Sequence, residues 1–182
     1  MHNIIYKSDS ILPWDTQSAF KMTSYKTDKE EHMVFCYLKG YVHGQDLVLC
    51  SYNFTENPSG DDNMELFLNL SPEKDKENIL KITYGYDGVK SAVIGGVDYK
   101  DSIDFRKFKA NDEQGFYWCG EIVLSHKIIK KLWYSIIQEK DIITLNMVQK
   151  FDNGDFSVLC GDATENNYNP ESDMEVFVVL NY

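Results

Sequence analysis

The sequence predicts an all-β protein: a single-domain antiparallel β-sandwich of jelly-roll type, with about nine or more strands and one short helix. Aromatic residues make up 14% of the 182 residues and only four alanines occur, a composition that favours strands over a helical bundle. The apolar runs are short and separated by turn residues, and a single segment shows helical periodicity. No linker or repeat divides the chain, so residues 1–182 are expected to form one domain.

The clearest strand signal lies at residues 64–70, where apolar residues alternate with Glu65, Phe67 and Asn69. A period of two places the two sets on opposite faces of a strand. Asp87-Gly88 and Asn153-Gly154 are typical of hairpin turns. Further strands are expected at residues 33–38, 46–54, 79–84, 91–94, 115–124, 142–149, 156–160 and 174–180.

The one predicted helix begins after Ser125, which is a suitable N-cap residue. Its apolar residues recur at helical spacing and form one stripe, while the lysines between them face solvent. The stripe consists of Ile128, Ile129, Leu132, Trp133 and Ile136. Longer connections are expected at residues 55–63, 95–114 and 161–173, and binding residues often lie on such loops.

The charge balance bears on the partners of the chain. The chain has 18 Lys and Arg and 29 Asp and Glu, which gives a formal net charge of −11. This negative charge repels nucleic acid and anionic lipid. No apolar run approaches the roughly 20 residues of a membrane span. The first residues lack the pattern of a signal peptide, so the expected location is cytoplasmic as the sequence stands, or extracellular if a leader was removed.

The metal-ligating residue types form no spaced motif. The four histidines are scattered, so a zinc or iron site is not expected. The four cysteines are expected to be reduced and buried, with a bridge between Cys36 and Cys50 left open. Residues 151–182 carry seven acidic residues and no Lys or Arg, which indicates either a solvated rim or a calcium site. Structural calcium is therefore the one cofactor considered, with its ligands unknown.

Two glutamates are candidates for catalysis. If Glu65 and Glu121 faced one cleft, they would form the carboxylate pair of a glycoside hydrolase, whereas each is equally explained as a surface residue on its own strand. Among the tryptophans, Trp118 and Trp133 are expected in the core, and Trp14 either covers a site as a lid or fastens the chain start as a staple.

Three segments resemble strands of the β-sandwich domains that are similar to family 9 carbohydrate-binding modules. Residues 60–69, GDDNMELFLN, resemble the family's central strand, D-x-x-E-[LIV]-F-[LIV]-[DN]. Residues 115–124 resemble its W-x-x-E-[IV]-x-[IL] strand, which precedes a short helical turn. Asn146 and the closing run 176–180 resemble its last two strands. The resemblance extends from Trp14 to Leu180, nearly the whole chain.

The resemblance implies a sugar site. In that family the glutamate of the central strand hydrogen-bonds the sugar, which corresponds to Glu65. The family also clamps the sugar between two tryptophans, and at those places this chain has Ser59 and offers Tyr168.

The leading hypothesis is a non-catalytic carbohydrate-binding domain for a neutral sugar or oligosaccharide, with contacts from Glu65, Asn53, Asn69 and Tyr168. One alternative is a protein-interaction or structural sandwich that has lost its sugar site. The other is a small glycoside hydrolase that uses Glu65 and Glu121. Carbohydrate is thus the expected partner, and the oligomeric state stays open.

Overall fold

The computed structural model describes residues 3–26, 28, 31–32, 36–55, 62–75, 77–112, 115–161 and 168–182. Its strands are β1 (Asn3–Ser8), β2 (Phe20–Lys21), β3 (Thr23–Tyr25), β4 (Glu31–His32), β5 (Cys36–His43), β6 (Asp46–Asn53), β7 (Asn63–Asn69), β8 (Leu80–Gly85), β9 (Gly88–Ile94), β10 (Val97–Asp98), β11 (Asp104–Asp112), β12 (Gly115–Leu124), β13 (Ile142–Lys150), β14 (Phe156–Val158) and β15 (Glu175–Asn181). The helices are η1 (Trp14–Thr16), η2 (Lys100–Ser102) and α1 (His126–Trp133).

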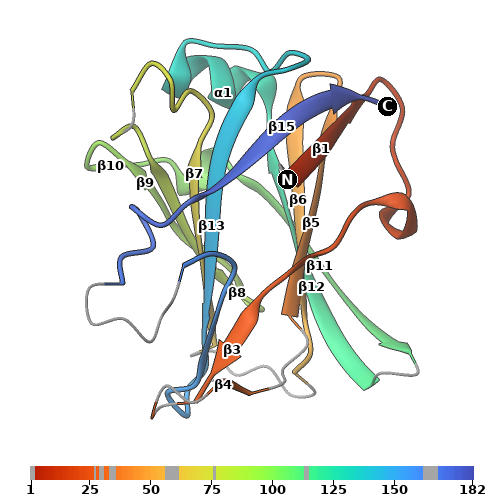
Figure 1. Cartoon of the computed structure of the whole chain (residues 1–182), viewed down its shortest axis with the longest axis vertical. Coiled ribbons are helices and arrows are strands. Elements are labelled where there is room, and N and C mark those ends of the chain that lie inside the picture. The colour runs from red at the N-terminus through yellow and green to blue at the C-terminus, as the bar shows by residue number, and fades with distance from the viewer. Residues whose placement is uncertain are drawn as a thin grey trace.

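The strands form one continuous sheet that curls on itself into a sandwich (Figure 1). The strand order is β10-β9-β8-β7-β13-β15-β1-β5-β6-β12-β11. Neighbours along this path are antiparallel except for β1, which runs parallel to both β15 and β5. The predicted sandwich with one short helix is confirmed, and the parallel strand β1 makes its sheet mixed.

The core lies between the two halves of the sheet. Leu66 and Ile82 point inward from β7 and β8, and Leu49, Trp118 and Ile122 point inward from β6 and β12. A Cβ added at Gly120 would lie 2.9 Å from the Tyr84 ring, so the inner faces of β12 and β8 are in close contact. Residues at alternate positions therefore point outward from opposite surfaces of the molecule.

Helix α1 closes one end of this core. Its predicted apolar residues Ile128, Ile129, Leu132 and Trp133 are buried, and the lysines between them are exposed. The helix ends at Trp133 because Tyr134 adopts a left-handed conformation with a φ of 53°. The predicted extension to Ile136 is wrong, since that residue lies beyond the helix and is 39% exposed. Within the described part of the chain, no helix is long and apolar enough to cross a membrane.

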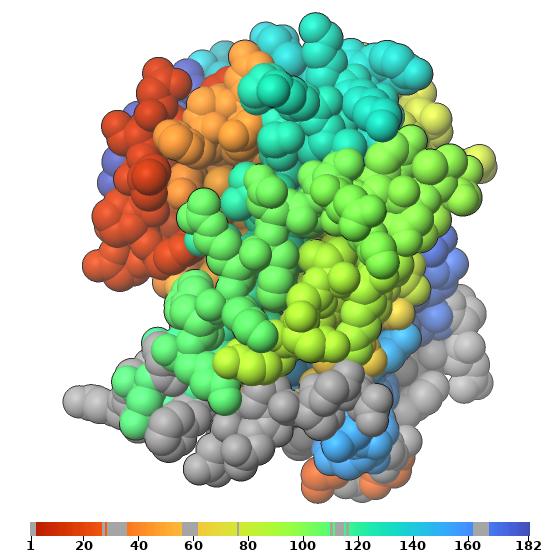
Figure 2. Space-filling model, turned by 180° about the vertical axis from the view of Figure 1, so that it is seen from behind, coloured from red at the N-terminus to blue at the C-terminus, as the bar shows by residue number. Residues whose placement is uncertain are grey.

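The loop predicted at residues 95–114 instead contains β10, η2 and β11. Strand β11 forms the edge of the sheet, and it lies on the back of the molecule beside the β9 side of the sandwich (Figure 2). Exposed Arg106, Lys107 and Lys109 interrupt its apolar pattern. Charged side chains on an edge strand prevent pairing with other chains, and the same residues hide the strand in the sequence.

The cysteines occupy different faces of the sheet. Cys36 points into the core, whereas Cys50 and Cys119 lie in a cluster on the outer face of β6 and β12. A bridge between Cys36 and Cys50 is therefore excluded, and all four cysteines are free.

Candidate functional site

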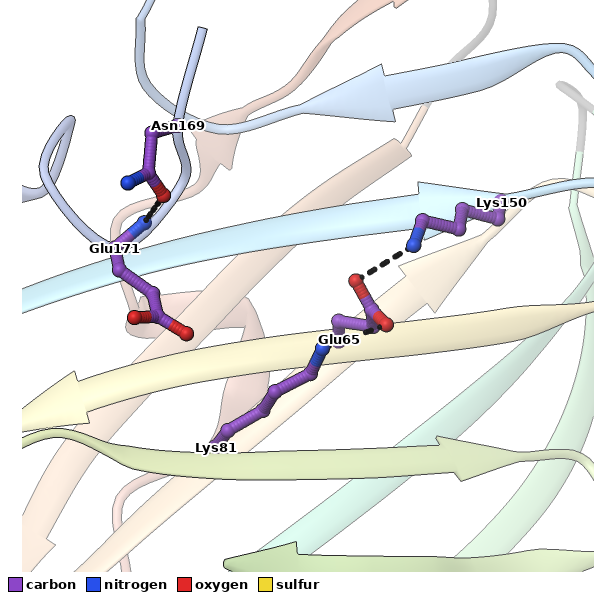
Figure 3. A network of polar contacts seen from close by, with 5 residues as sticks. All are labelled: Glu65, Lys81, Lys150, Asn169 and Glu171. Atoms are coloured by element: carbon purple, nitrogen blue, oxygen red, sulfur yellow. Dashed lines mark hydrogen bonds and ion pairs between the residues drawn. The ribbon is translucent and has the colours of Figure 1, made fainter. Parts of the chain in front are cut away.

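A carboxylate held by two lysines marks the outer face of the β8-β7-β13 part of the sheet. Glu65 points outward because its neighbours Met64 and Leu66 point into the core. Lys81 Nζ lies 3.0 Å from Glu65 Oε1, and Lys150 Nζ lies 2.9 Å from Glu65 Oε2. Figure 3 shows that the three side chains come from three neighbouring strands and meet on one surface.

The two lysines set the charge state of this carboxylate. Burial of Glu65, whose side chain is only 14% exposed, favours the neutral acid, but the hydrogen bonds from Lys150 and Lys81 outweigh it and lower the pKa of Glu65. The lysine side chains remain 37% and 55% exposed. The site therefore presents an ionised acceptor flanked by two accessible donors, a set that can bind several hydroxyl groups.

We expect Glu65 to make stability depend on pH. Because folding lowers its pKa from 4.5, its contribution is complete at neutral pH and is lost as the pH falls below 4.5 through the folded value. Glu65→Gln should lower the free energy of unfolding by about 1 kcal/mol at pH 7. Urea unfolding at pH 7 and pH 3 measures this difference, which should shrink at pH 3.

Glu121→Gln is the control, because Glu121 makes one ion pair of 3.7 Å with a mostly exposed Arg106. It should change little at either pH. A Glu65→Gln difference that is the same at pH 3 and pH 7 would contradict the role given to the lysines.

An aromatic cluster lies next to Glu65 on the same outer face. Phe67, two residues further along β7, is 1% exposed although it points away from the main core. The Lys81 ammonium lies 5.2 Å from the centre of its ring. The cluster consists of Tyr25, Phe67, Val148 and Val158, with Ile79, Phe156, Tyr168 and Met174 packed against it.

Asn146 of β13 anchors residues 168–173 to this face. Its side chain is fully buried, and Nδ2 lies 2.8 Å from the Asp173 carbonyl oxygen and 3.2 Å from that of Pro170. Its Oδ1 accepts from the backbone N–H groups of Met147 at 2.8 Å and Cys160 at 3.1 Å. One amide thus fixes the segment that borders the candidate site.

Tyr168 belongs to the anchored segment. Its hydroxyl donates to the Cys160 carbonyl oxygen at 3.2 Å and lies 3.3 Å from Asn146 Nδ2. Burial raises the pKa of Tyr168 to about 12, so the phenol stays protonated at neutral pH. Tyr168 lies in the connection predicted at residues 161–173, and the structure places it half-buried against the outer cluster.

A groove of about 720 Å³ opens beside the cluster. Glu171, whose backbone N–H donates to Asn169 Oδ1 at 3.0 Å, and Glu65 lie on the same side of the sheet (Figure 3). The lining mixes apolar surface with hydroxyl, amide and carboxylate groups, as a sugar site requires. The lining residues are Pro72, Glu77, Ile79, Thr144, Asn169, Glu171, Ser172 and Met174.

Two of the predicted contacts are buried side chains that bond within the protein, although Asn69 lies on the outer face of β7 opposite the groove-lining Thr144. Asn53 is fully buried and points inward, where its Nδ2 donates to Ser51 Oγ at 3.1 Å, so it cannot meet a ligand at the surface. Asn69 is 1% exposed, and it accepts from the Ser71 N–H and donates to the Asp75 carbonyl oxygen. Alternation along β6 places Asn53 with Leu49 on the inner face.

The carboxylate pair of a hydrolase is not formed. Glu65 points outward from β7 and Glu121 points outward from β12, on opposite halves of the sandwich with the core between them. A glycosidase needs its two carboxylates on either side of one bond. The alternative hypothesis of a hydrolase whose Glu65 and Glu121 share one cleft is therefore wrong.

The structure also places the tryptophans and the acidic residues. Trp118 and Trp133 are buried as predicted, and Trp14 packs edge-on against Tyr41 with ring centres 5.3 Å apart, as a staple would.

In the described ranges no three metal-ligating side chains come close enough to hold an ion. Ser59, and the part of the acidic run at residues 162–167, lie outside the described residues.

Sequence reasoning missed both lysines that bind Glu65. Lys81 alternates with buried Leu80 and Ile82, a signal that it points outward. The sequence does not show which strands are neighbours in the sheet, because β7 pairs with β13 across more than seventy residues of sequence. The groove was also missed, since its lining comes from four separate segments.

Solved structures share this fold, although no protein-family model and no curated protein matches the sequence. A family 9 carbohydrate-binding module from Caldicellulosiruptor kristjanssonii in complex with cellotriose has a TM-score of 0.71 and 11% identity, covering 99% of this chain and 94% of its own. A family 9 module from the same organism in complex with glucose has a TM-score of 0.69 and 10% identity, covering 99% and 95%. A proposed carbohydrate-binding protein from Bacteroides uniformis has a TM-score of 0.57 and 7% identity, and the match covers 96% of this chain and 97% of that protein. The predicted resemblance is confirmed at the level of the fold.

Proposed function

We propose that the chain is a non-catalytic carbohydrate-binding domain whose site is the outer face of β7, β8 and β13. The observation that carries the proposal is the ionised Glu65 held between Lys81 and Lys150, on the same outer face as the open groove and separated from it along β7 by Phe67. Carboxylates and ammonium groups bind sugar hydroxyls, and apolar lining such as Ile79 and Met174 suits the C–H face of a sugar ring. The fold shared with modules that bind cellotriose and glucose supports the same reading.

The preferred ligand is a neutral sugar. Glu77 and Glu171 line the groove, and the chain carries a net charge of −11. Both features repel uronates and sulfated glycans. Glu65 neutralises one of the two lysine charges, and Glu77 and Glu171 together exceed the one positive charge that remains.

A glycan array with neutral and acidic glycans, probed with wild type and with Glu65→Ala, tests the proposal. We expect neutral glycans to bind wild type, with the signal reduced at least tenfold in the variant, about 1.4 kcal/mol of binding free energy. Glu121→Ala, on the opposite surface, is the matched control and should bind as wild type does.

Repeating the array with calcium and with a chelator tests the calcium hypothesis. Binding that requires calcium would assign a role to the acidic residues of the C-terminal segment. Silence across all glycans would reject the sugar proposal and leave a protein-interaction domain as the better reading.

A further inference from the structure

The groove on the outer face of the sheet continues past Pro72. A second, smaller pocket of about 60 Å³ shares Pro72 with the main groove and reaches Ser135 and Asp141, just beyond the end of α1. A bound chain that leaves the main groove at Pro72 would therefore pass the C-terminal end of the helix. The residue before Ser135 is Tyr134.

Tyr134 is unusual in two respects. Its side chain is 90% exposed, the highest value among the exposed large apolar and aromatic residues of the described chain. Its backbone lies in the left-handed region, with a φ of 53° and a ψ of 32°, at the position after a helix where glycine is the usual residue. A tyrosine at this position strains the backbone, and because its ring is exposed, no burial of the ring offsets that strain. Strained conformations of this kind concentrate at functional sites.

The end of α1 is fixed to the wall of the groove. Asn78 Nδ2 donates to the Leu132 carbonyl oxygen at 3.2 Å, and Trp133 Nε1 donates to the Asn78 carbonyl oxygen at 3.1 Å. Asn78 lies between Glu77 and Ile79, and both of these line the main groove. Tyr134 is therefore held at a fixed position relative to the groove, immediately after a residue bonded to its wall.

We propose that Tyr134 is an outlying aromatic subsite, which makes this a site for a neutral oligosaccharide rather than for a single sugar. The inference rests on the proposed function and adds the length of the ligand to it. The main groove binds one end of the chain, and the ring of Tyr134 stacks on the C–H face of a sugar unit further along. Asp141 and Ser135, between the two, offer acceptors to its hydroxyl groups.

Calorimetric titration with glucose and with cello-oligosaccharides of two to four units tests the subsite. We expect wild type to bind the longer chains about three- to tenfold more tightly than glucose, the gain of one aromatic contact. Tyr134→Gly should abolish this gain and leave glucose affinity unchanged. Glycine suits the left-handed backbone, so the variant should fold at least as well as wild type. Tyr134→Phe keeps the ring and should keep the gain.

Tyr182→Ala is the matched control, because Tyr182 is 70% exposed and packs against Tyr6 instead of the groove. It should keep the full gain. Equal affinity gains in wild type and Tyr134→Gly would overturn the subsite while leaving the Glu65 site intact. Absence of binding by glucose and by all the cello-oligosaccharides would overturn the subsite, whereas the proposed function falls only if wild type is also silent on the array of neutral and acidic glycans.

Discussion

Replacement of Asn146 by alanine is expected to abolish sugar binding and to lower the free energy of unfolding by about 2–4 kcal/mol. The change removes the donor to the Asp173 carbonyl oxygen and the acceptor of two backbone N–H groups, all at a fully buried position. Those partners would be left unpaired and poorly solvated, which costs more than the loss of the bonds themselves. Residues 168–173, which border the groove, would lose their anchor on β13.

The measurement pairs urea unfolding with calorimetric titration of cellotriose. Asn181→Ala is the control, since Asn181 is exposed and its side chain makes one bond, to Glu139 Oε2 at 2.8 Å. It should change stability by less than about 0.5 kcal/mol. If Asn146→Ala bound cellotriose like wild type, the anchored segment would have no part in the site.

Trp118→Ala is expected to be the most destabilising single change, at about 3–5 kcal/mol. Trp118 is 1% exposed, and it meets Tyr86 edge-on with ring centres 5.8 Å apart. Its removal would leave a large cavity between the two halves of the sheet. Among the described residues its Nε1 has no hydrogen-bond partner, so no broken bond of that group is counted in this cost.

Thermal and urea unfolding of Trp118→Ala and Trp14→Ala measure this effect. Trp14 is half-buried at the outer surface, so its loss should cost about 1–2 kcal/mol. Equal losses for the two variants would contradict the packing described for the core. Folded Trp118→Ala protein should still bind sugar, because Trp118 points away from the outer face.

The sequence was informative where a strand has one buried and one exposed face. Residues 64–70 alternate cleanly, and the structure forms β7 over Asn63–Asn69 with Glu65 outward. The prediction missed β1, a short strand near the chain start, and β11, because Arg106, Lys107 and Lys109 interrupt its apolar pattern. The charges of β11 are explained by its position at the edge of the sheet. The local pattern of apolar and polar residues cannot show that position.

The site was predictable only in part, for the same reason. Glu65 was identified from its strand, whereas Lys81 and Lys150 reach it through pairings between distant segments. Asn53 was predicted as a contact, although its alternation with Leu49 along β6 places it on the inward-facing side of that strand. In the structure it faces the core, where Ser51 and the Trp118 carbonyl oxygen bind its amide nitrogen.

The parallel pairing of β1 with β15 has a mechanical consequence. Asn3 lies opposite Phe177 and Lys7 lies opposite Asn181. The start of β1 and the end of β15 are therefore at opposite ends of this strand pair. Tension that draws the two ends apart acts along the strands and loads their backbone hydrogen bonds together, in shear, instead of opening them one after another. Because β15 and β1 also join the two halves of the sheet, this pair is where the domain would resist stretching.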